Sequence, residues 1–323
     1  MSVATKRVLV TGAGGFVGAN LVRRLLTDGH EVTAAVRPAA SRWRLQGLEG
    51  DVRVEDLDMA DGERVSALVA ALAPEWAFHL AAHGAYSWQT DAQAIMRTNV
   101  LGTVSLVDAC ADAGCESFVH AGSSSEYGFK DHAPREDEAI EPNSAYAVAK
   151  AAATAYCRQV ACTGRLDATT LRLYSVYGPW EEPRRLMPRL VAHAMSGRLP
   201  PLVDPGVARD FVAAPDTVEA FVLAAEIPPV EPGRVLNIGS GTQTRLAELI
   251  DLVRRLLDVQ AEPNWGTAPA RSWDTATWVA DPRSAAEELG WRARLDLEAG
   301  VSQMISWLRT TPTVWEPYGV RGH

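Results

Sequence analysis

Paired cysteines and long apolar runs are both missing from this sequence. Its four cysteines, Cys110, Cys115, Cys157 and Cys162, form no Cys-x-x-Cys pair and have no histidines nearby at zinc-binding spacing. This pattern predicts free thiols in a reducing compartment and no metal site. No stretch is long and apolar enough to span a bilayer, and glycines interrupt the first apolar run too early for a signal peptide. We therefore expect a cytoplasmic protein without a membrane partner.

An excess of basic residues is missing as well. The chain has 31 Lys and Arg against 40 Asp and Glu, which gives a formal net charge of −9 and a pI near 5.3. A protein of this charge has little general affinity for nucleic acids. Small phosphorylated ligands are not excluded, because a few local arginines or a helix N-terminus suffice to bind them.

In the first half of the chain, short β-rich runs alternate with segments whose apolar residues have helical spacing. Short β-rich runs lie at 7–12, 31–37, 52–57, 76–82, 117–123 and 168–178. Segments with helical spacing lie between them, at 16–29, 64–72, 99–114 and 145–161. Such alternation predicts an α/β fold, a doubly wound parallel sheet of Rossmann type with helices on both faces and right-handed crossovers.

A glycine-rich turn follows the first predicted strand. In "VTGAGGFVGAN", Gly12, Gly15 and Gly18 recur at three-residue spacing before a helix. Glycine permits the tight turn, a close approach of the backbone to a pyrophosphate, and close packing of the helix on the strand. The helix N-terminus adds free N–H groups and a partial positive charge. We predict that this turn, with Phe16 and Val17, binds a dinucleotide.

The end of the second strand lacks the carboxylate that would indicate NAD. An acidic residue there binds the adenosine ribose hydroxyls, whereas an arginine suits the 2′-phosphate of NADP. This strand ends in Arg37, with Ser41 and Arg42 close behind. The sequence therefore predicts NADP(H), with NAD(H) as the alternative. Asp56 and Leu57 follow the third strand, where they are predicted to meet the adenine, although a helix-capping role explains Asp56 nearly as well.

The second half of the chain is less regular. Beyond Pro179 prolines and arginines are frequent. We expect residues 1–172 to form the dinucleotide-binding domain and 173–323 to form mainly a smaller C-terminal substrate-binding lobe. A strand near 234–239 is expected to return to the main sheet, and the tail from 310 to 323 is expected to be a loosely held arm.

Tyr146 and Lys150 in "SAYAVAK" lie four residues apart, on one face of a predicted helix. A phenol with a pKa of about 10 is a poor base at neutral pH. A neighbouring ammonium group, together with the positive charge of an oxidised nicotinamide, lowers that pKa. Hydride transfer to a ketone creates an alkoxide, so this tyrosine can supply the proton while a nearby serine hydroxyl orients the carbonyl group.

With these residues the sequence resembles the extended short-chain dehydrogenase/reductase family, in its nucleotide-sugar epimerase, dehydratase and ketoreductase group. The motifs "TGAGGFVG", "DLDMAD", "HLAA", "TNVLGT", "GSSSEYG", "SAYAVAK", "RLYSVYGP" and "ARDFV" follow one another in the family's order, over roughly residues 6 to 310. The resemblance implies a catalytic set of Ser123, Tyr146 and Lys150. It also implies cofactor contacts from Ala81, and from Asn99, which is similar to an asparagine that supports the active-site lysine through water.

A carboxylate pair is missing where the resemblance to sugar 4,6-dehydratases would require one. In those enzymes Asp and Glu follow the active hydroxyl directly, whereas here Ser124 and Ser125 follow Ser123. Glu126 comes one residue late, and a shift of one residue at a strand end turns a side chain away. A dehydratase is therefore disfavoured.

The resemblance also implies substrate contacts. Arg209 is similar to the family's diphosphate-binding arginine, Arg271 is a candidate for a second one, and Ser124 is expected to meet the sugar. Ser175 stands where many members have an asparagine against the sugar diphosphate, which leaves the identity of the nucleotide open.

The leading interpretation is NADP(H)-dependent reduction of a nucleoside-diphosphate keto sugar, of the 4-keto-6-deoxyhexose type, with Tyr146 as proton donor. An NAD-dependent nucleotide-sugar 4-epimerase is the first alternative, because it uses the same three residues, and a 4,6-dehydratase is less favoured. A reductase of other carbonyl compounds and a non-catalytic cofactor sensor are further alternatives. The resemblance also implies a homodimer, formed through the helices that begin near Asn99 and Tyr146.

Overall fold

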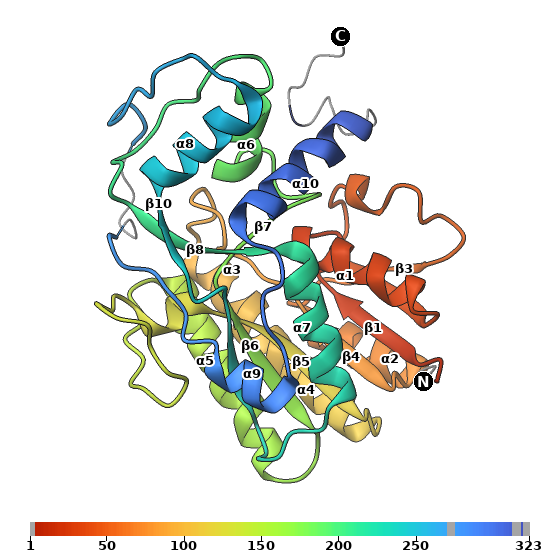
Figure 1. Cartoon of the computed structure of the whole chain (residues 1–323). Helices are drawn as coiled ribbons and strands as arrows, with labels where there is room; N and C mark the ends of the chain where they lie inside the picture. Colours follow the sequence, from red (N-terminus) through yellow and green to blue (C-terminus); the bar gives the residue numbers. More distant parts are fainter. Residues whose placement is uncertain (1–3, 270–274, 312–317, 319–323) are drawn as a thin grey trace.

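A seven-stranded sheet forms the centre of the computed structural model, which describes residues 4–269, 275–311 and 318 (Figure 1). All neighbouring strands in this sheet run parallel, in the order β3-β2-β1-β4-β5-β6-β9. The strands are β1 (Arg7–Thr11), β2 (Glu31–Val36), β3 (Arg53–Asp56), β4 (Trp76–His79), β5 (Ser117–Ser123), β6 (Ala168–Leu173) and β9 (Val235–Ile238). The α/β fold of Rossmann type expected from the sequence is confirmed.

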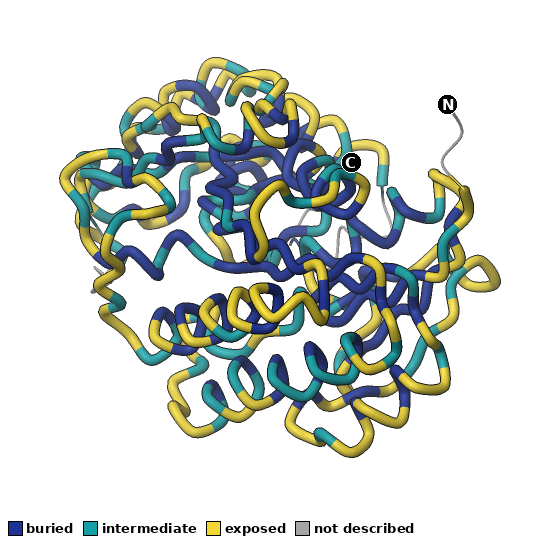
Figure 2. The backbone as a smooth tube through the Cα atoms, turned by 90° about the horizontal axis from the view of Figure 1, so that it is seen from below, coloured by how far each residue is buried: buried dark blue, intermediate teal, exposed yellow. Residues whose placement is uncertain are grey.

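Helices cover both faces of the sheet. Successive residues of β1 show why: Val8 and Val10 pack into one buried cluster, while Leu9 packs into another on the opposite face. One face holds α1 (Phe16–Thr27), α7 (Ala214–Glu226) and α9 (Arg283–Leu289), and the other holds α2 (Gly62–Leu72), α4 (Gly102–Asp112) and α5 (Ala145–Cys162). In Figure 2 the buried residues accordingly concentrate in the middle of the molecule, and exposed residues follow the outer turns.

The helix expected over 99–114 begins earlier than the sequence suggested. It starts with α3 (Ala92–Met96), where the Asp91 carboxylate accepts the N–H groups of the first turn. A π-helical turn, η2 (Arg97–Leu101), then leads directly into α4. Such turns insert one extra residue into a helix and are frequent at functional sites.

A smaller lobe is built on a second, three-stranded sheet. It has the order β10-β8-β7, from β7 (Ser175–Tyr177), β8 (Ala208–Ala213) and β10 (Gln243–Arg245). Three helices pack with it around a separate apolar core, α6 (Leu186–Ala194), α8 (Leu246–Leu257) and α10 (Leu297–Thr310). The lobe is not one continuous segment, because α7, β9 and α9 lie between its parts in the chain and pack on the main sheet.

One residue of the C-terminal tail is firmly packed. Tyr318 is buried, its ring lies edge-on to those of Trp43 and Trp307, and its hydroxyl donates to the carbonyl oxygen of Glu181. At this residue the expectation of a loosely held arm is wrong, because an aromatic side chain fills a gap between the short helix η1 (Trp43–Leu45) and α10.

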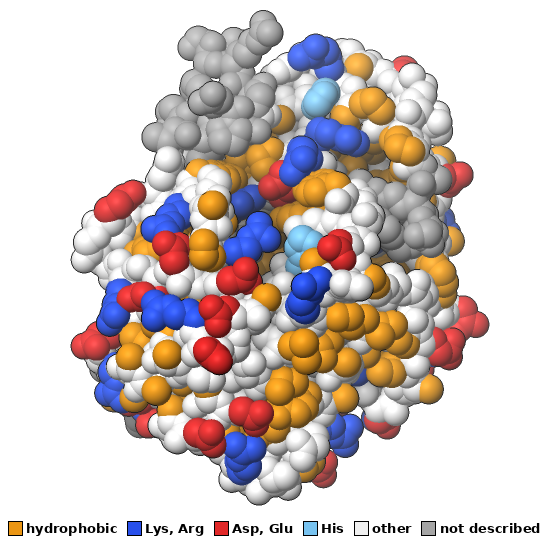
Figure 3. All heavy atoms as spheres, turned by 180° about the vertical axis from the view of Figure 1, so that it is seen from behind, with side chains coloured by type: hydrophobic (Ala, Val, Ile, Leu, Met, Phe, Trp, Pro, Cys, Tyr) orange, Lys and Arg blue, Asp and Glu red, His pale blue; other side chains and the backbone are white. Residues whose placement is uncertain are grey.

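Some large apolar side chains stay exposed on the surface. Leu101 of η2 is 60% exposed and Val148 of α5 is 41% exposed. Figure 3 shows hydrophobic side chains gathered over one region of the rear face. Among the helices of the described residues, none combines the length and the apolar character needed to cross a bilayer.

The packing of α7 on the sheet gives a stability prediction. Phe221 is fully buried, and its ring meets that of Phe78 on β4 edge-on, with the ring centroids 6.3 Å apart. Phe221→Ala is expected to lower the free energy of unfolding by about 3–5 kcal/mol, because it removes apolar contact and leaves a cavity. Urea unfolding measures this loss. Val230→Ala is the control, since Val230 is 87% exposed; equal unfolding midpoints for the two variants would contradict this packing.

Candidate active site

A cleft of about 830 Å³ lies at the carboxyl ends of the strands, between the main sheet and the smaller lobe. Its floor includes Thr11 at the end of β1, Leu80 just after β4 and Gly122 in β5. The strand order reverses between β1 and β4, and in open α/β sheets ligands bind in the crevice at such a point.

The glycine turn forms one wall of this cleft. Gly12 has a φ of +68°, and a Cβ there would lie 2.6 Å from the backbone nitrogen of Ala81. A Cβ at Gly18 would collide with the carbonyl oxygen of Gly12. The first turn of α1 has no side-chain cap, so its free N–H groups are available to an anion. The five predicted residues of this turn line the cleft, Gly12, Gly15, Phe16, Val17 and Gly18, and they fit a dinucleotide pyrophosphate.

Three further predicted cofactor residues lie near the ends of β2 and β3. Arg37 and Leu57 line the cleft, but Asp56 does not. The Asp56 carboxylate instead pairs with Arg42 on the surface, at 2.6 Å. Asp58, which the sequence analysis missed, lines the cleft next to Leu57. The motif "DLDMAD" contains three acidic residues, and the sequence alone does not show which of them faces the cleft. That depends on the residue at which β3 ends.

Tyr146 and Lys150 face the cleft from the first turns of α5. The Ser144 hydroxyl caps this helix by accepting the N–H of Ala147 at 3.1 Å. Lys150 is 2% exposed, its Nζ donates to the carbonyl oxygen of Ala121 at 2.9 Å, and it lies 6.0 Å from the centroid of the Tyr146 ring. The spacing of four residues thus places the two side chains side by side, as predicted.

Burial shifts the pKa values of this pair in opposite directions. It raises the pKa of the Tyr146 phenol to about 12, against the effect of a hydrogen bond with Ser123. It lowers the pKa of the Lys150 ammonium to about 8, against the attraction of Glu126. In both cases the charged form is the one that burial disfavours. At neutral pH the tyrosine therefore holds its proton, and the lysine remains mostly charged.

Ser123 ends β5 and begins the short helix η3 (Ser124–Tyr127). Its Oγ accepts the N–H of Ser125 at 3.2 Å and lies 2.8 Å from Ser125 Oγ. Ser123 and Ser124 line the cleft together with Tyr146 and Lys150. The structure therefore brings the predicted catalytic residues together at one point.

Glu126 points into the protein and away from the cleft. It is fully buried, and its carboxylate accepts the backbone N–H of Ser123 at 2.9 Å and pairs with Arg172 at 3.0 Å. Glu126 comes one residue after the position expected for the carboxylate pair of a 4,6-dehydratase. As expected from that shift, its side chain points away from the cleft and cannot reach a substrate there.

Asn99 lies in the π-helical turn, behind the wall of the cleft. Its side chain is 1% exposed and holds both backbone groups of His83, accepting from N–H and donating to C=O at 2.8 Å each. It thus fixes the loop that follows β4. Support of Lys150 through water stays a prediction.

The smaller lobe and the loop after β4 contribute the opposite wall. Ser175 and Arg209 line the cleft, as do Arg184 and Arg185, which the sequence analysis missed. Arg271 lies outside the described residues. The missed arginines belong to a proline-rich loop, "PWEEPRR", and periodicity cannot place the side chains of a loop.

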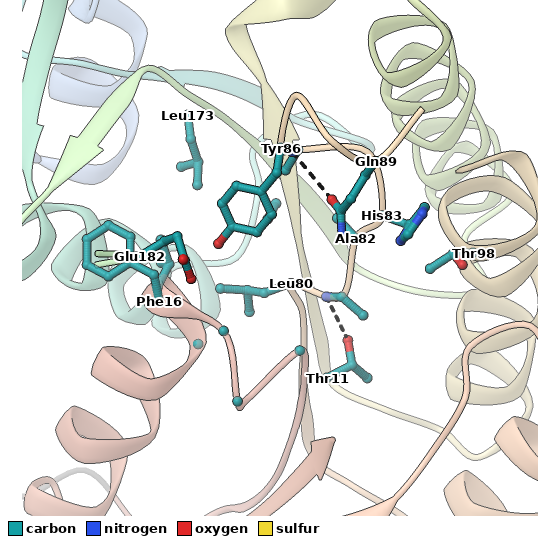
Figure 4. Close-up of a pocket in the computed structure, with 18 of the residues that line it drawn as sticks. Thr11, Phe16, Leu80, Ala82, His83, Tyr86, Gln89, Thr98, Leu173 and Glu182 are labelled. Atoms are coloured by element: carbon teal, nitrogen blue, oxygen red, sulfur yellow. Dashed lines mark hydrogen bonds between the residues drawn. The ribbon is translucent and has the colours of Figure 1, made fainter. Parts of the chain in front are cut away.

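Aromatic rings connect the loop after β4 to the arginine loop of the smaller lobe. The rings of Tyr86 and Trp88 stack with centroids 4.7 Å apart, and the Arg184 guanidinium lies 3.8 Å above the Trp88 ring. Figure 4 shows Tyr86 reaching from the loop after β4 toward the side on which Glu182 and Phe16 lie. The Gln89 side chain holds this loop by accepting the N–H groups of Gly84 and Tyr86, at 3.0 and 3.3 Å.

A family model described as "NAD dependent epimerase/dehydratase family" matches residues 8–239 of the chain. UDP-glucose 4-epimerase of Mycolicibacterium smegmatis is 32% identical over 313 residues, which cover 94% of this chain and 98% of that protein. dTDP-glucose 4,6-dehydratase of Streptomyces griseus is 32% identical over 329 residues, which cover 97% of each.

Solved structures give the same result. UDP-glucose 4-epimerase of Thermotoga maritima, with UDP-glucose, superposes with a TM-score of 0.85 at 26% identity, over 94% of this chain and 99% of that one. MoeE5 in complex with UDP-glucuronic acid and NAD superposes with a TM-score of 0.82 at 33% identity, with the same coverage.

The glycine turn gives a binding prediction. Gly18→Ala is expected to weaken binding of NADPH and NADH at least about tenfold, because the added methyl group pushes α1 away from the turn. Fluorescence titration of the reduced dinucleotides measures the effect. Gly206→Ala is the matched control, because its methyl group would meet only the Asp204 side chain, outside the cleft. Unchanged affinity in Gly18→Ala would mean that the dinucleotide binds elsewhere.

Proposed function

The chain belongs to the NAD dependent epimerase/dehydratase family, and we propose that it reduces a nucleoside-diphosphate 4-keto sugar with NADPH. The observation that carries this proposal is the combination of residues around one cleft. Ser123, Tyr146 and Lys150 meet there, Arg37 lines the dinucleotide end, and Ser124 and Ser125 occupy the positions of a dehydratase carboxylate pair.

Arg37 supports the choice of NADPH. It is the residue directly after β2, it is exposed, and it lines the cleft. A guanidinium group there suits a ribose 2′-phosphate, which it can bind through two parallel hydrogen bonds. Neighbouring structures are described with NAD, as in MoeE5 and the UDP-glucose 4-epimerase of Thermus thermophilus. NAD(H) is therefore the alternative cofactor.

The state of Tyr146 supports reduction. When bound, the nicotinamide supplies the hydride. Tyr146, whose pKa burial raises to about 12, holds its proton at neutral pH and can give it to the carbonyl oxygen of the sugar. The ammonium group of Lys150 favours the phenolate that remains. The Ser123 hydroxyl, at the end of β5, orients the same oxygen.

The arginines of the smaller lobe support a nucleoside-diphosphate substrate. Arg184, Arg185 and Arg209 line the cleft, and guanidinium groups suit the diphosphate. Ser124 and Ser175 add hydroxyl groups for the sugar, and Arg271 remains a candidate for a second diphosphate contact. Among the neighbouring structures, MoeE5 is described in complex with UDP-glucose and with UDP-glucuronic acid.

A nucleotide-sugar 4-epimerase is the second candidate. It uses the same three residues, and UDP-glucose 4-epimerases are similar to this chain over nearly its whole length. A dehydratase is less favoured although one is 32% identical. Dehydration needs a carboxyl pair beside the active hydroxyl, and of the described residues that line the cleft the carboxylic acids are Asp58 and Glu182, neither of which follows Ser123.

We also propose a cytoplasmic homodimer. The exposed side chains of Leu101 and Val148 lie on η2 and α5, and burying them against a second copy would remove apolar surface from water. Three of the four cysteines are free and buried, Cys110, Cys115 and Cys157, which is compatible with a reducing compartment.

A substrate panel tests the proposed reaction. The protein is incubated with NADPH and a set of nucleoside-diphosphate 4-keto-6-deoxyhexoses, and the configuration of any product is read by NMR. We expect oxidation of NADPH and a single configuration at C4 with at least one substrate. Interconversion of UDP-glucose with its C4 epimer, without net use of NADPH, would establish the epimerase instead.

The cofactor choice is tested by Arg37→Asp. Under the proposal this change puts a carboxylate where the ribose 2′-phosphate is expected to bind, so the KM for NADPH should rise at least about tenfold while that for NADH falls or stays the same. Steady-state kinetics with both cofactors measure the two values. Arg64→Asp is the matched control, because it makes the same change of charge at an arginine that pairs with Glu55 and does not line the cleft. A KM for NADPH that is unaffected by Arg37→Asp would contradict the assignment.

A further inference from the structure

A buried carboxylate lies next to the catalytic residues, and the proposed chemistry does not use it. Glu126 is fully buried, three residues after the catalytic serine. It belongs to η3, where it closes a capping box with Ser123: the Ser123 side chain accepts a backbone N–H of the short helix, and the Glu126 side chain accepts the N–H of Ser123.

The Glu126 carboxylate connects two strands of the main sheet, β5 and β6, with the helix α5 that packs on it. Oε1 accepts the N–H of Ser123 on β5 at 2.9 Å and the hydroxyl of Thr154 on α5 at 3.1 Å. Oε2 accepts from Nε of Arg172 on β6 at 3.0 Å. An isolated carboxylate is costly to bury, so its burial here depends on all three partners.

Thr154 gives this carboxylate a direct connection to the proton-transfer residues. Tyr146, Lys150 and Thr154 follow one another at intervals of four along α5, so they share one face of the helix. The hydrogen bond from Thr154 to Glu126 therefore fixes that face relative to Ser123. A misplacement of about 1 Å in a catalytic site can cost a large part of the rate.

The charge of Glu126 also acts on Lys150. Burial lowers the pKa of Lys150 to about 8, and Glu126 opposes that effect. Cys157, His79 and His120 face Lys150 as well, and burial keeps all three neutral at pH 7, because it raises the pKa of the thiol and lowers those of the imidazoles. Among these neighbours Glu126 supplies the negative charge.

We propose that Glu126 is a positioning residue for the catalytic set: its carboxylate ties the backbone of Ser123 to the face of α5 that carries Tyr146 and Lys150, and it holds a negative charge beside that face. The kinetic test of this inference rests on the proposed hydride-transfer function. The arrangement of Glu126, Ser123 and α5 can be tested without a substrate.

Thr154→Val tests the positioning. Valine keeps the shape of threonine and removes only the hydroxyl that reaches Glu126. We expect kcat to fall about tenfold, with the KM values for NADPH and the sugar unchanged, and Thr154→Ser to restore most of the rate. Thr217→Val is the matched control, because Thr217 is also a buried helical threonine, and its hydroxyl donates to the carbonyl oxygen of Ala213 at 3.1 Å, where neither residue lines the cleft.

A kcat in Thr154→Val that equals that of the wild type, or that falls no more than in Thr217→Val, would overturn the positioning role. Crystal structures of the wild type and Thr154→Val decide the same point without substrate. The variant should show Tyr146 displaced relative to Ser123, and an unchanged arrangement overturns the proposal. A wild type that is inactive on every sugar would reject the proposed function separately.

Glu126→Gln tests the charge. The active site needs charged Lys150, and that form is lost as the pH rises through its pKa. Without the Glu126 charge burial lowers this pKa further, so the alkaline limb of the kcat profile should move to lower pH than in the wild type. Glu126→Gln/Arg172→Gln is measured alongside, because it leaves no unpaired charge buried. Alkaline limbs that coincide with that of the wild type in both variants would overturn the electrostatic part.

Discussion

The Gly12 turn passes directly over the backbone that leaves β4, and the cleft depends on this close approach. β1 pairs with β2 on one side and with β4 on the other, and the helices that follow these strands lie on opposite faces of the sheet. A crevice therefore opens between the ends of β1 and β4. Only a residue without a side chain fits there, because a Cβ at Gly12 would lie 2.6 Å from the nitrogen of Ala81.

The chemistry at the other end of the cleft depends on burial. Tyr146 and Lys150 are neighbours at the cleft, Lys150 buried and Tyr146 partly buried, and this burial keeps the phenol protonated and makes the ammonium group easier to deprotonate. A neutral phenol beside a charged amine can donate a proton and tolerate the phenolate that results. Glu126, on the far side of Ser123, offsets part of the cost of burying the Lys150 charge.

The sequence predicted those parts of the site that local geometry determines. The glycine turn and the Tyr146–Lys150 pair follow from spacing within a turn and within a helix, and the structure brings these residues to one cleft; their roles stay predictions. Arg184 and Arg185 could not be predicted, because their place in the cleft depends on how a proline-rich loop folds over the main sheet. The π-helical turn around Asn99 and the place of Asp58 in the lining of the cleft could not be predicted for a similar reason, since each depends on the residue at which an element begins or ends.

In the proposed reduction Tyr146 is the proton donor, and a single-turnover experiment on Tyr146→Phe tests this role most directly. The variant and the wild type are each mixed with NADPH and a reducible nucleoside-diphosphate keto sugar, and oxidation of the nicotinamide is followed by stopped flow. We expect a rate at least roughly 100-fold lower in the variant, with unchanged binding of NADPH and the sugar. A rate in Tyr146→Phe that matches that of the wild type would contradict it.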